Sequence, residues 1–448
     1  MTKTSIIILA AGKGTRMKSD LPKVMHKVAG LEMLNMVISA ASELNLQEIS
    51  IVVSEEFTQF EQKIFDQNPN INLSFVTQIE RSGTGNAAFV GFKSLTKPAD
   101  KILVLYGDTP LLKKETLQEM TSALDDSKVS VLGFECFDEN QYGKLVVDEN
   151  GDLDRIVENK DANEEERQIE LCNSGVVAVD GSKFEEFLSK IDNDNAAGEY
   201  YLTDVVKIAR QGGFTCSYIV TGDEEVLGVN TKIELARVER IKQDELRLFH
   251  LQNGVTIIDP ASVYFAADTK IGNDCIIHPN VVFGAGVEIA SGVEVKAFSH
   301  IEKSKIGSSA TIGPFARIRP GSQIGEEVRI GNFVEVKNST LKKGSKVNHL
   351  SYVGDSEIGK NSNIGAGVIT CNYDGYDKFK TDIGAGAFIG SNTALVAPVT
   401  IGDGAIIGAG STVTKAVEKD ALLVERSTEV QKPGWAARFR QLKAKLKG

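Results

Sequence analysis

The pattern of apolar positions along the chain changes near residue 250. Over residues 1–228, short apolar runs alternate with segments of helical spacing, which predicts an α/β sheet with crossover helices. Apolar residues at a helical spacing over Thr231–Leu251 then stop at Asn253-Gly254, so we expect a connecting helix in a linker of residues 229–254. The runs expected to form strands are Ser5–Ala10, Ile49–Val53, Ile102–Tyr106, Val129–Phe134 and Gly175–Val179.

From Ile271 to Val413, apolar residues recur at every sixth position, with a few interruptions. A period of six fits neither a helix nor an alternating strand. It fits a short strand plus a turn, with one inward side chain per unit and glycine or asparagine where φ is positive. Three units close a coil of about 18 residues, and coils stack about 4.8 Å apart by backbone pairing. Residues 255–448 are therefore predicted to form a parallel β-helix, a prism whose flat faces suit self-association.

One insertion, Cys371–Lys378, interrupts this repeat between Thr370 and Ile383. No coil of the β-helix requires these residues. Loops that leave a rigid scaffold commonly serve binding, so we expect this loop to contact a ligand.

Composition excludes several classes of protein. The chain has 448 residues, enough for two or three domains, and no continuous apolar stretch reaches the ~18 residues of a membrane span. A net charge of −11 argues against general nucleic-acid binding, which needs a basic face. Met1–Ala10 lacks the features of a secretory signal, so we expect a cytosolic protein. The cysteines are too far apart for a disulfide framework and are predicted to be free thiols: Cys136, Cys172, Cys216, Cys275 and Cys371.

The first predicted strand leads into a glycine-rich turn, Ala11–Met17, which is followed by Leu21–Lys23. The turn lacks the third glycine of a dinucleotide fingerprint and the Gly-Lys-Ser/Thr ending of a P-loop. Glycines after a strand still let backbone N–H groups approach phosphate, and Arg16 and Lys23 could neutralise a leaving pyrophosphate. Taken alone, such a turn indicates phosphate binding only weakly, because most glycine turns after strands are simply turns.

The complete string, Leu9–Met17 with Leu21–Lys23, resembles the signature of the sugar-phosphate nucleotidyltransferases. The resemblance implies a Rossmann-like mixed sheet and a magnesium ion held by Asp108 and Asn230. It also implies uracil contacts from Gln78, Gly83 and Thr84, and sugar contacts from Gly143, Glu158 and Asn173. The sequence departs from the pattern at Asn86 and Lys144, where relatives often have histidine and arginine. The residues that the resemblance places in the uridylyl-transfer site are Leu9, Ala10, Ala11, Gly12, Lys23, Gln78, Gly83, Thr84, Tyr106, Gly107, Asp108, Gly143, Glu158, Asn173 and Asn230.

Uridylyl transfer requires the protein mainly to position the two reactants and to supply positive charge near the phosphates. A sugar phosphate is already ionised near pH 7, so its oxygen can attack the α-phosphorus of UTP without a general base. The metal, Arg16 and Lys23 would stabilise the departing pyrophosphate.

The predicted β-helix also has placed polar residues. Arg319 and Lys337 fall one coil apart on equivalent positions, and His349 falls on another face. Two stacked cations suit a phosphate, and an imidazole suits proton removal from an amine. Alternatively, the cations could be edge charges and the histidine a turn residue.

Together with Asn363, the Asn372-Tyr373 loop and Lys378, these residues resemble the glucosamine-1-phosphate acetyltransferase domain of the bifunctional enzymes that make UDP-N-acetylglucosamine. The resemblance covers nearly the whole chain in the same domain order. It implies a left-handed, trimeric β-helix whose acetyl-transfer sites use neighbouring subunits, with His349 as the base. Arg319, Lys337 and Lys378 would hold the sugar phosphate, Tyr352 and Asn363 the sugar. The implied acetyl-CoA contacts are Ala366, Asn372, Tyr373, Ser391, Ala409 and Arg426.

We therefore expect a bifunctional cytosolic homotrimer that uses Mg²⁺, UTP, acetyl-CoA, glucosamine 1-phosphate and N-acetylglucosamine 1-phosphate, without nucleic-acid or membrane partners. Such an enzyme would supply precursors of peptidoglycan and lipopolysaccharide. Two alternatives remain: a monofunctional nucleotidyltransferase with a purely structural β-helix, and an inactive regulatory subunit. The tail, Lys432–Gly448, is basic and could be solvated or could cover the coenzyme's phosphates; its cations are Lys432, Arg438, Arg440, Lys443, Lys445 and Lys447.

Overall fold

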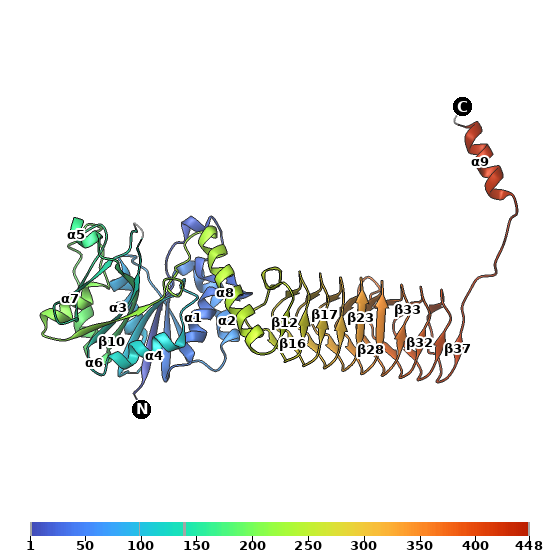
Figure 1. Ribbon diagram of the computed structural model, residues 1–448, viewed down its shortest axis with the longest axis horizontal. Coiled ribbons are helices and arrows are strands. Elements are labelled where there is room, and N and C mark those ends of the chain that lie inside the picture. Colours follow the sequence, from blue (N-terminus) through green and yellow to red (C-terminus); the bar gives the residue numbers. More distant parts are fainter. Residues whose placement is uncertain (1, 98, 138–139, 447–448) are drawn as a thin grey trace. The chain divides into compact units, whose positions relative to one another are not determined.

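The computed structural model describes residues 2–97, 99–137 and 140–446, so Lys447 and Gly448 of the basic tail lie outside the described residues. The chain divides into two compact units (Figure 1), the first ending at Leu246 and the second beginning at Arg247. The division falls within helix α8 (Lys232–Gln252), close to the connecting helix that the sequence predicts. None of the helices in the described residues is both long and apolar enough to cross a membrane.

The first unit is built on a mixed β-sheet with the strand order β11-β7-β10-β6-β1-β4-β5. Strands β1, β4, β5 and β6 are parallel, whereas β10 runs antiparallel to β6 and β7. All five strands predicted from the sequence are present. The strands are β1 Thr4–Leu9, β4 Leu46–Val53, β5 Leu73–Thr77, β6 Lys101–Tyr106, β7 Val129–Glu135, β8 Lys144–Val147, β9 Leu153–Val157, β10 Leu171–Asp180 and β11 Cys216–Thr221, with a small ribbon of β2 Lys27–Val28 and β3 Leu31–Glu32.

Helices cover both faces of this sheet, because the central strand β1 is apolar on both sides. Ile6 and Ile8 pack with α1, α2 and α4, whereas Ile7 and Leu9 pack with α3, α6 and α7. This alternation follows the two-residue period of a strand. The helices are α1 Met33–Ser42, α2 Thr58–Gln67, α3 Thr84–Ser94, α4 Lys114–Ala123, α5 Glu164–Arg167, α6 Gly181–Leu188 and α7 Asp204–Gln211, with 3-10 turns η1 Thr15–Met17, η2 Lys23–Met25 and η3 Glu55–Phe57.

The second unit is a left-handed parallel β-helix of three sheets, followed by the exposed helix α9 (Trp435–Lys445). The first sheet consists of β12 Thr256–Ile257, β14 Ile276–Ile277, β17 Glu294–Val295, β20 Thr311–Ile312, β23 Arg329–Asn332, β26 Lys346–His349, β29 Asn363–Ile364, β32 Phe388–Ile389, β35 Ile406–Ile407 and β37 Leu422–Leu423. The second sheet consists of β15 Val282–Phe283, β18 His300–Ile301, β21 Arg317–Ile318, β24 Glu335–Lys337, β27 Tyr352–Gly354, β30 Ile369–Cys371, β33 Ala394–Val396 and β36 Thr412–Val413. The third sheet consists of β13 Lys270–Ile271, β16 Glu288–Ile289, β19 Lys305–Ile306, β22 Gln323–Ile324, β25 Thr340–Leu341, β28 Ser356–Ile358, β31 Thr381–Ile383 and β34 Val399–Ile401; a 3-10 turn, η4 (Pro260–Ser262), precedes the regular coils.

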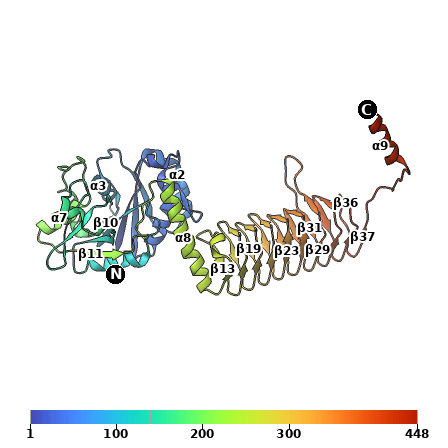
Figure 2. The ribbon, with the colours of Figure 1, turned by 45° about the horizontal axis from the view of Figure 1, so that its top comes forward.

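The six-residue series supplies the core of the β-helix. Its members are buried from Ile277 to Val413, and only Ile271, in an early coil, is partly exposed. The predicted insertion leaves the coils between β30 and β31 and projects from them as a loop (Figure 2), closed by a bridge between Tyr373 and Lys378.

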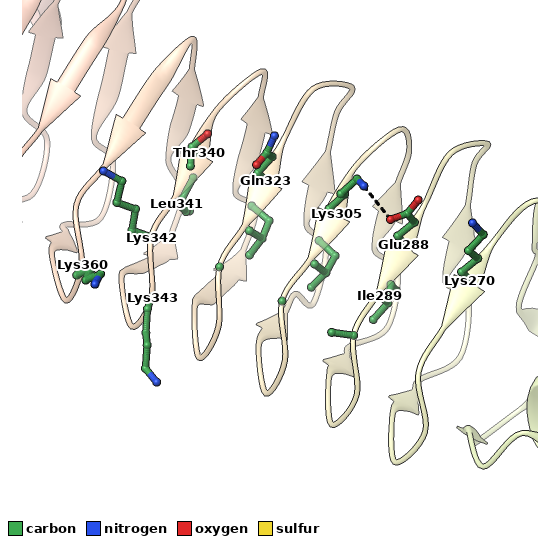
Figure 3. A pocket seen from close by; sticks show the side chains of 15 residues that line it. Lys270, Glu288, Ile289, Lys305, Gln323, Thr340, Leu341, Lys342, Lys343 and Lys360 are labelled. Carbon is green, nitrogen blue, oxygen red and sulfur yellow. Dashed lines mark ion pairs between the residues drawn. The ribbon is translucent and has the colours of Figure 1, made fainter.

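The outer faces of the β-helix differ in polarity. The third sheet presents a polar ladder that includes Lys270, Glu288 and Lys305 (Figure 3), with Lys305 Nζ 2.9 Å from a Glu288 carboxylate oxygen. The corner between the first and second sheets instead presents an exposed apolar ridge. The ridge consists of Phe298, Phe315, Phe333 and Leu350, and its aromatic rings stack from coil to coil.

Candidate active sites

A cleft of about 390 Å³ lies at the carboxyl ends of β1 and β6 in the first unit. These strands pair so that Leu9 stands opposite Tyr106, which brings the segments that follow both strands to the same sheet edge. Ligands bind at this edge in α/β proteins. The predicted site residues that line the cleft are Leu9, Ala10, Ala11, Gly12, Lys23, Gln78, Gly83, Thr84, Tyr106, Asp108 and Asn230.

The side chains of Asp108 and Asn230 both contact the Lys23 ammonium group in this cleft. Lys23 Nζ forms an ion pair with the Asp108 carboxylate and donates to Asn230 Oδ1 at 3.2 Å. Glu234 fixes the turn from below, because its carboxylate accepts the Asn230 N–H at 2.7 Å. Two oxygen ligands that already face one positive charge fit a Mg²⁺ ion, which usually takes few protein ligands and completes its shell with water and phosphate.

The glycine turn lets Lys23 reach the cleft. Gly14 has a φ of 58°, and a Cβ atom there would stand 2.9 Å from Lys23 Cβ. Gly12 is open, with no atom within 4 Å of the position of a Cβ. Arg16 lies on η1, is exposed and does not line the cleft, and no described residue pairs with it. Its long side chain is therefore available for an incoming phosphate.

One wall of the cleft is formed by Gln78 and the turn before α3. Gly83 has a φ of 119°, and a Cβ atom there would stand 2.4 Å from the Tyr200 carbonyl oxygen, so only glycine fits. The backbone of Tyr200 holds this turn, since its N–H donates to Ser82 and its carbonyl accepts from Gly85, both at 2.8 Å.

The predicted sugar contacts lie beside the cleft rather than in its lining. The Asn173 N–H donates to the Gly143 carbonyl at 2.8 Å, and the Glu158 carboxylate lies close to Gly143. Burial raises the pKa of Glu158. Burial, followed by the charges of Asp108 and Glu158, also raises the pKa of Tyr106, so this phenol stays protonated between the two groups. Of the full predicted set, Gly107 is buried directly behind the cleft.

In the second unit, the two predicted cations stack on the second sheet. The pairing of β21 with β24 places Arg319 and Lys337 on equivalent positions, as the spacing predicts. Arg319 donates to Glu335 at 2.7 Å, and Lys337 lies 3.0 Å from Asp355. The carboxylates therefore hold both cations at one edge of the sheet.

His349 ends strand β26 of the first sheet, on a different face from the cations, as expected. Its Nδ1 lies 2.9 Å from Asn332 Oδ1. In a neutral ring that donates from Nδ1 to the amide oxygen, Nε2 has the lone pair. Tyr352 lies on the strand of the second sheet that follows His349. Tyr352 stands opposite Glu335 in the pairing of β24 with β27, and Lys337 stands opposite Gly354, two positions further along the strand.

Three of the predicted acetyl-CoA residues form a column that begins at His349, whereas Asn372 and Tyr373 lie at the inserted loop. Backbone pairs of Val347 with Ile364, and of Ile364 with Ile389, align consecutive coils. The residues two positions further along therefore stack in one column, extended by the next pair of strands. The column consists of His349, Ala366, Ser391 and Ala409, and Arg426 Nε donates to the Ala409 carbonyl at 3.1 Å. Three coil steps span about 14 Å, which suits an extended ligand.

Asp355 was not assigned a role from the sequence, yet it organises this region. Its carboxylate accepts from Lys337 at 3.0 Å, from Asn338 at 2.6 Å and from the buried Asn372 at the base of the insertion. Burial opposes ionisation, but these hydrogen bonds lower the pKa of Asp355 overall. The sequence signal that could have identified Asp355 is its position one coil after Lys337. Asn332, the partner of His349, was also missed. Lys378, by contrast, is exposed on the projecting loop, and Asn363 lies on β29 of the first sheet.

A cleft at the strand ends of an α/β sheet, in a chain that continues into a β-helix with an exposed histidine, is typical of a two-domain transferase. Known families agree with this class. Residues 6–149 match the MobA-like NTP transferase domain, residues 300–373 match the GMPPB C-terminal domain, and residues 268–303 and 380–415 match the bacterial transferase hexapeptide repeat.

Relatives of similar length identify the family of transferases to which the chain belongs. The chain is 48% identical to the bifunctional protein GlmU of Paramagnetospirillum magneticum, over 100% of this chain and 98% of the relative. It is 50% identical to the bifunctional protein GlmU of Parvibaculum lavamentivorans, over 97% and 95% of the two chains. The chain belongs to the GlmU family of bifunctional proteins.

Proposed function

We propose that this chain makes UDP-N-acetylglucosamine in two steps. The β-helix transfers an acetyl group from acetyl-CoA to glucosamine 1-phosphate. The α/β unit then transfers a uridylyl group from UTP to the N-acetylglucosamine 1-phosphate, releasing pyrophosphate. The observation that carries this proposal is the presence, in one chain, of the Lys23–Asp108–Asn230 cluster and the His349 column.

Uridylyl transfer in the cleft needs no general base. A phosphate oxygen of the sugar phosphate forms a bond to the α-phosphorus of UTP, the bond from that phosphorus to the bridging oxygen breaks, and pyrophosphate leaves. Lys23 and Arg16 neutralise the charge on the leaving group. Asp108 and Asn230 would hold Mg²⁺, which supplies further positive charge beside the phosphates when it is bound.

Acetyl transfer follows from the order of groups from the second sheet to the end of the first sheet. Arg319 and Lys337 hold the phosphate, and the sugar lies over Tyr352, so the amine faces His349. Nε2 of His349 takes a proton as the amine attacks the thioester carbon; the C–N bond forms, the C–S bond breaks and coenzyme A leaves. The coenzyme lies along Ala366, Ser391, Ala409 and Arg426, and Asn363 contacts the sugar.

We further propose that the working form is a homotrimer. The apolar ridge from Phe298 to Leu350 supports this assembly, because exposed aromatic rings stacked over several coils commonly mark an interface. The polar third sheet then faces solvent. Lys378 lies on a loop that projects from its own coils, and it has no ion pair among the described residues. It would enter the acetyl site of a neighbouring subunit, to which Tyr373 and Asn372 also contribute.

We assign uridylyl transfer to a domain of residues 1–228 and acetyl transfer to a domain of residues 255–448. Residues 229–254 form the linker between them. Five free thiols and the use of UTP and acetyl-CoA support a cytoplasmic location. There the product would feed the synthesis of peptidoglycan and lipopolysaccharide, and so cell-wall formation.

The proposal is tested by two assays on the purified full-length chain with Mg²⁺. Acetyl-CoA and glucosamine 1-phosphate, without UTP, should release free coenzyme A thiol. UTP and N-acetylglucosamine 1-phosphate should release pyrophosphate. Pyrophosphate release without thiol release would make the β-helix a scaffold, and loss of both would contradict the proposal.

A further inference from the structure

The orientation of the Gln78 side-chain amide is fixed from behind the cleft. Gln78 is 7% exposed and its Nε2 lies 3.4 Å from the Gly83 carbonyl oxygen. A carbonyl oxygen can only accept a hydrogen bond, so the Gln78 atom that faces it must be the NH₂ group. The same Nε2 donates to Asn86 Oδ1 at 2.9 Å. The hydrogen bond to Asn86 is therefore the shorter and stronger of the two that set the orientation of the Gln78 amide.

Asn86 itself is not part of the cleft lining. It lies on the first turn of α3, behind Gln78, whereas Gln78 and Gly83 both line the cleft. With Nε2 engaged on the inner side, Gln78 Oε1 has no partner among the described residues. The Gly83 N–H likewise donates to no described residue. The wall of the cleft thus offers one free acceptor and one free donor.

We propose that Asn86 is a positioning residue that selects the base of the nucleotide by holding Gln78 with Oε1 toward the cleft. This inference rests on the proposed uridylyl transfer. Uracil presents a carbonyl acceptor next to an N3–H donor, which complements the Gly83 N–H and Gln78 Oε1. Cytosine and adenine reverse both groups, with an amino donor beside an unprotonated ring nitrogen, so each would set donor against donor and acceptor against acceptor.

Without Asn86, the weaker Gly83 contact alone holds the amide, and Gln78 can rotate to offer NH₂ to a base. The discrimination between uracil and cytosine should then fall, while the reacting groups around Lys23 and Asp108 stay in place. Guanine presents the same acceptor and donor pattern as uracil, so the rejection of GTP must come from the size of the base and should not depend on Asn86.

The experiment compares wild type with Asn86→Leu, which has similar volume but no acceptor, and Asn86→Asp, which keeps an oxygen that can only accept. The ratio of kcat/KM for UTP to that for CTP is measured in pyrophosphate release with N-acetylglucosamine 1-phosphate. Asn86→Leu should lower this ratio by about tenfold, mainly through a higher KM for UTP, with kcat changed less than about twofold. Asn86→Asp should retain the wild-type ratio, because any repulsion of the triphosphate affects both nucleotides equally.

An unchanged ratio in Asn86→Leu would overturn the proposal, as would an equal loss in Asn86→Asp. Activity with GTP serves as an internal control and should not rise in either variant. Thiol release by the second unit and an unchanged circular dichroism spectrum report correct folding. If wild type released no pyrophosphate from UTP at all, the proposed function would fail first, and the inference would fall with it.

Discussion

The two units build their sites in opposite ways. In the α/β unit, residues from Leu9 to Asn230 come from several strand ends and turns and converge in one concave cleft on a single chain. In the β-helix, His349, Lys337 and the column from Ala366 to Ala409 lie on convex outer faces, at positions fixed by the coil register. A sheet with crossover helices creates its own hollow, whereas a β-helix gains one only where another chain or an inserted loop covers a face. The first site should therefore be complete in one subunit, and the second should depend on assembly.

The largest effect is expected from removing His349, the proposed base on the β-helix. His349→Ala should lower thiol release by about a thousandfold, because general-base catalysis contributes on this scale. Pyrophosphate release should stay within about twofold of wild type if the two sites are separate. His300→Ala, which removes another exposed histidine from the second sheet, is the matched control and should affect neither activity.

Removing Arg16 from the α/β unit should have a smaller effect. Arg16→Ala should lower kcat for pyrophosphate release by about a hundredfold with little change in the KM for the sugar phosphate, because the guanidinium acts on charge that develops as pyrophosphate leaves. Lys18→Ala removes a neighbouring exposed cation and should be nearly silent. Equal kcat in wild type and Arg16→Ala would remove this role from Arg16.

If the acetyl sites of the β-helix are shared between subunits, two inactive variants should restore thiol release when they assemble together. If each acetyl site combines His349 of one subunit with the loop of its neighbour, co-expression of His349→Ala and Lys378→Ala chains gives about a quarter of sites with both groups intact. Thiol release should then recover to about a quarter of wild type. No recovery above the separate variants would place both groups in the same subunit.

The smallest effect concerns pH and stability at the start of the β-helix. His250 is buried against Phe265, neither of its ring nitrogens has a described partner, and burial lowers its pKa. The unfolded chain therefore binds a proton that the folded chain does not as the pH falls below about 6.5, and the free energy of unfolding should decrease by up to about 1.4 kcal/mol per pH unit. Denaturant titrations at pH 7.5 and 5.5 check this. His250→Phe should flatten the dependence, and an unchanged slope would assign it to other groups.

The sequence predicted the β-helix more fully than the α/β unit. A six-residue period specifies every inward position, the stacking of Arg319 on Lys337 and the ejected loop, because the register of a β-helix is set by spacing alone. In the α/β unit, strands β1, β6 and β10 were predicted because both of their faces are buried and their sequences are continuously apolar. Strands β8 and β9 form a partly exposed ribbon, and their short mixed sequences gave no comparable signal.

The partners of the predicted site residues gave little signal in the sequence for a related reason: Asp355 and Asn332 were not predicted, and Asn86 was noted only as a departure from the family pattern. Asp355, Asn332 and Asn86 matter because of which side chain each one faces, and that pairing joins residues from different coils or from opposite sides of a turn. The residues predicted to contact ligands come from a family signature, which names them directly. Their partners depend on tertiary geometry, which neither period nor motif contains.

The central claim is that one chain carries two separate active sites, one in each unit. Two variants test it most directly: Asp108→Asn, disabled in the α/β cleft, and His349→Ala, disabled on the β-helix. Each purified variant alone is given glucosamine 1-phosphate, acetyl-CoA and UTP, and formation of UDP-N-acetylglucosamine is followed. Neither should make product alone, whereas an equal mixture of the two should make it after a lag, as N-acetylglucosamine 1-phosphate passes between them. A mixture that remains inactive would contradict the account.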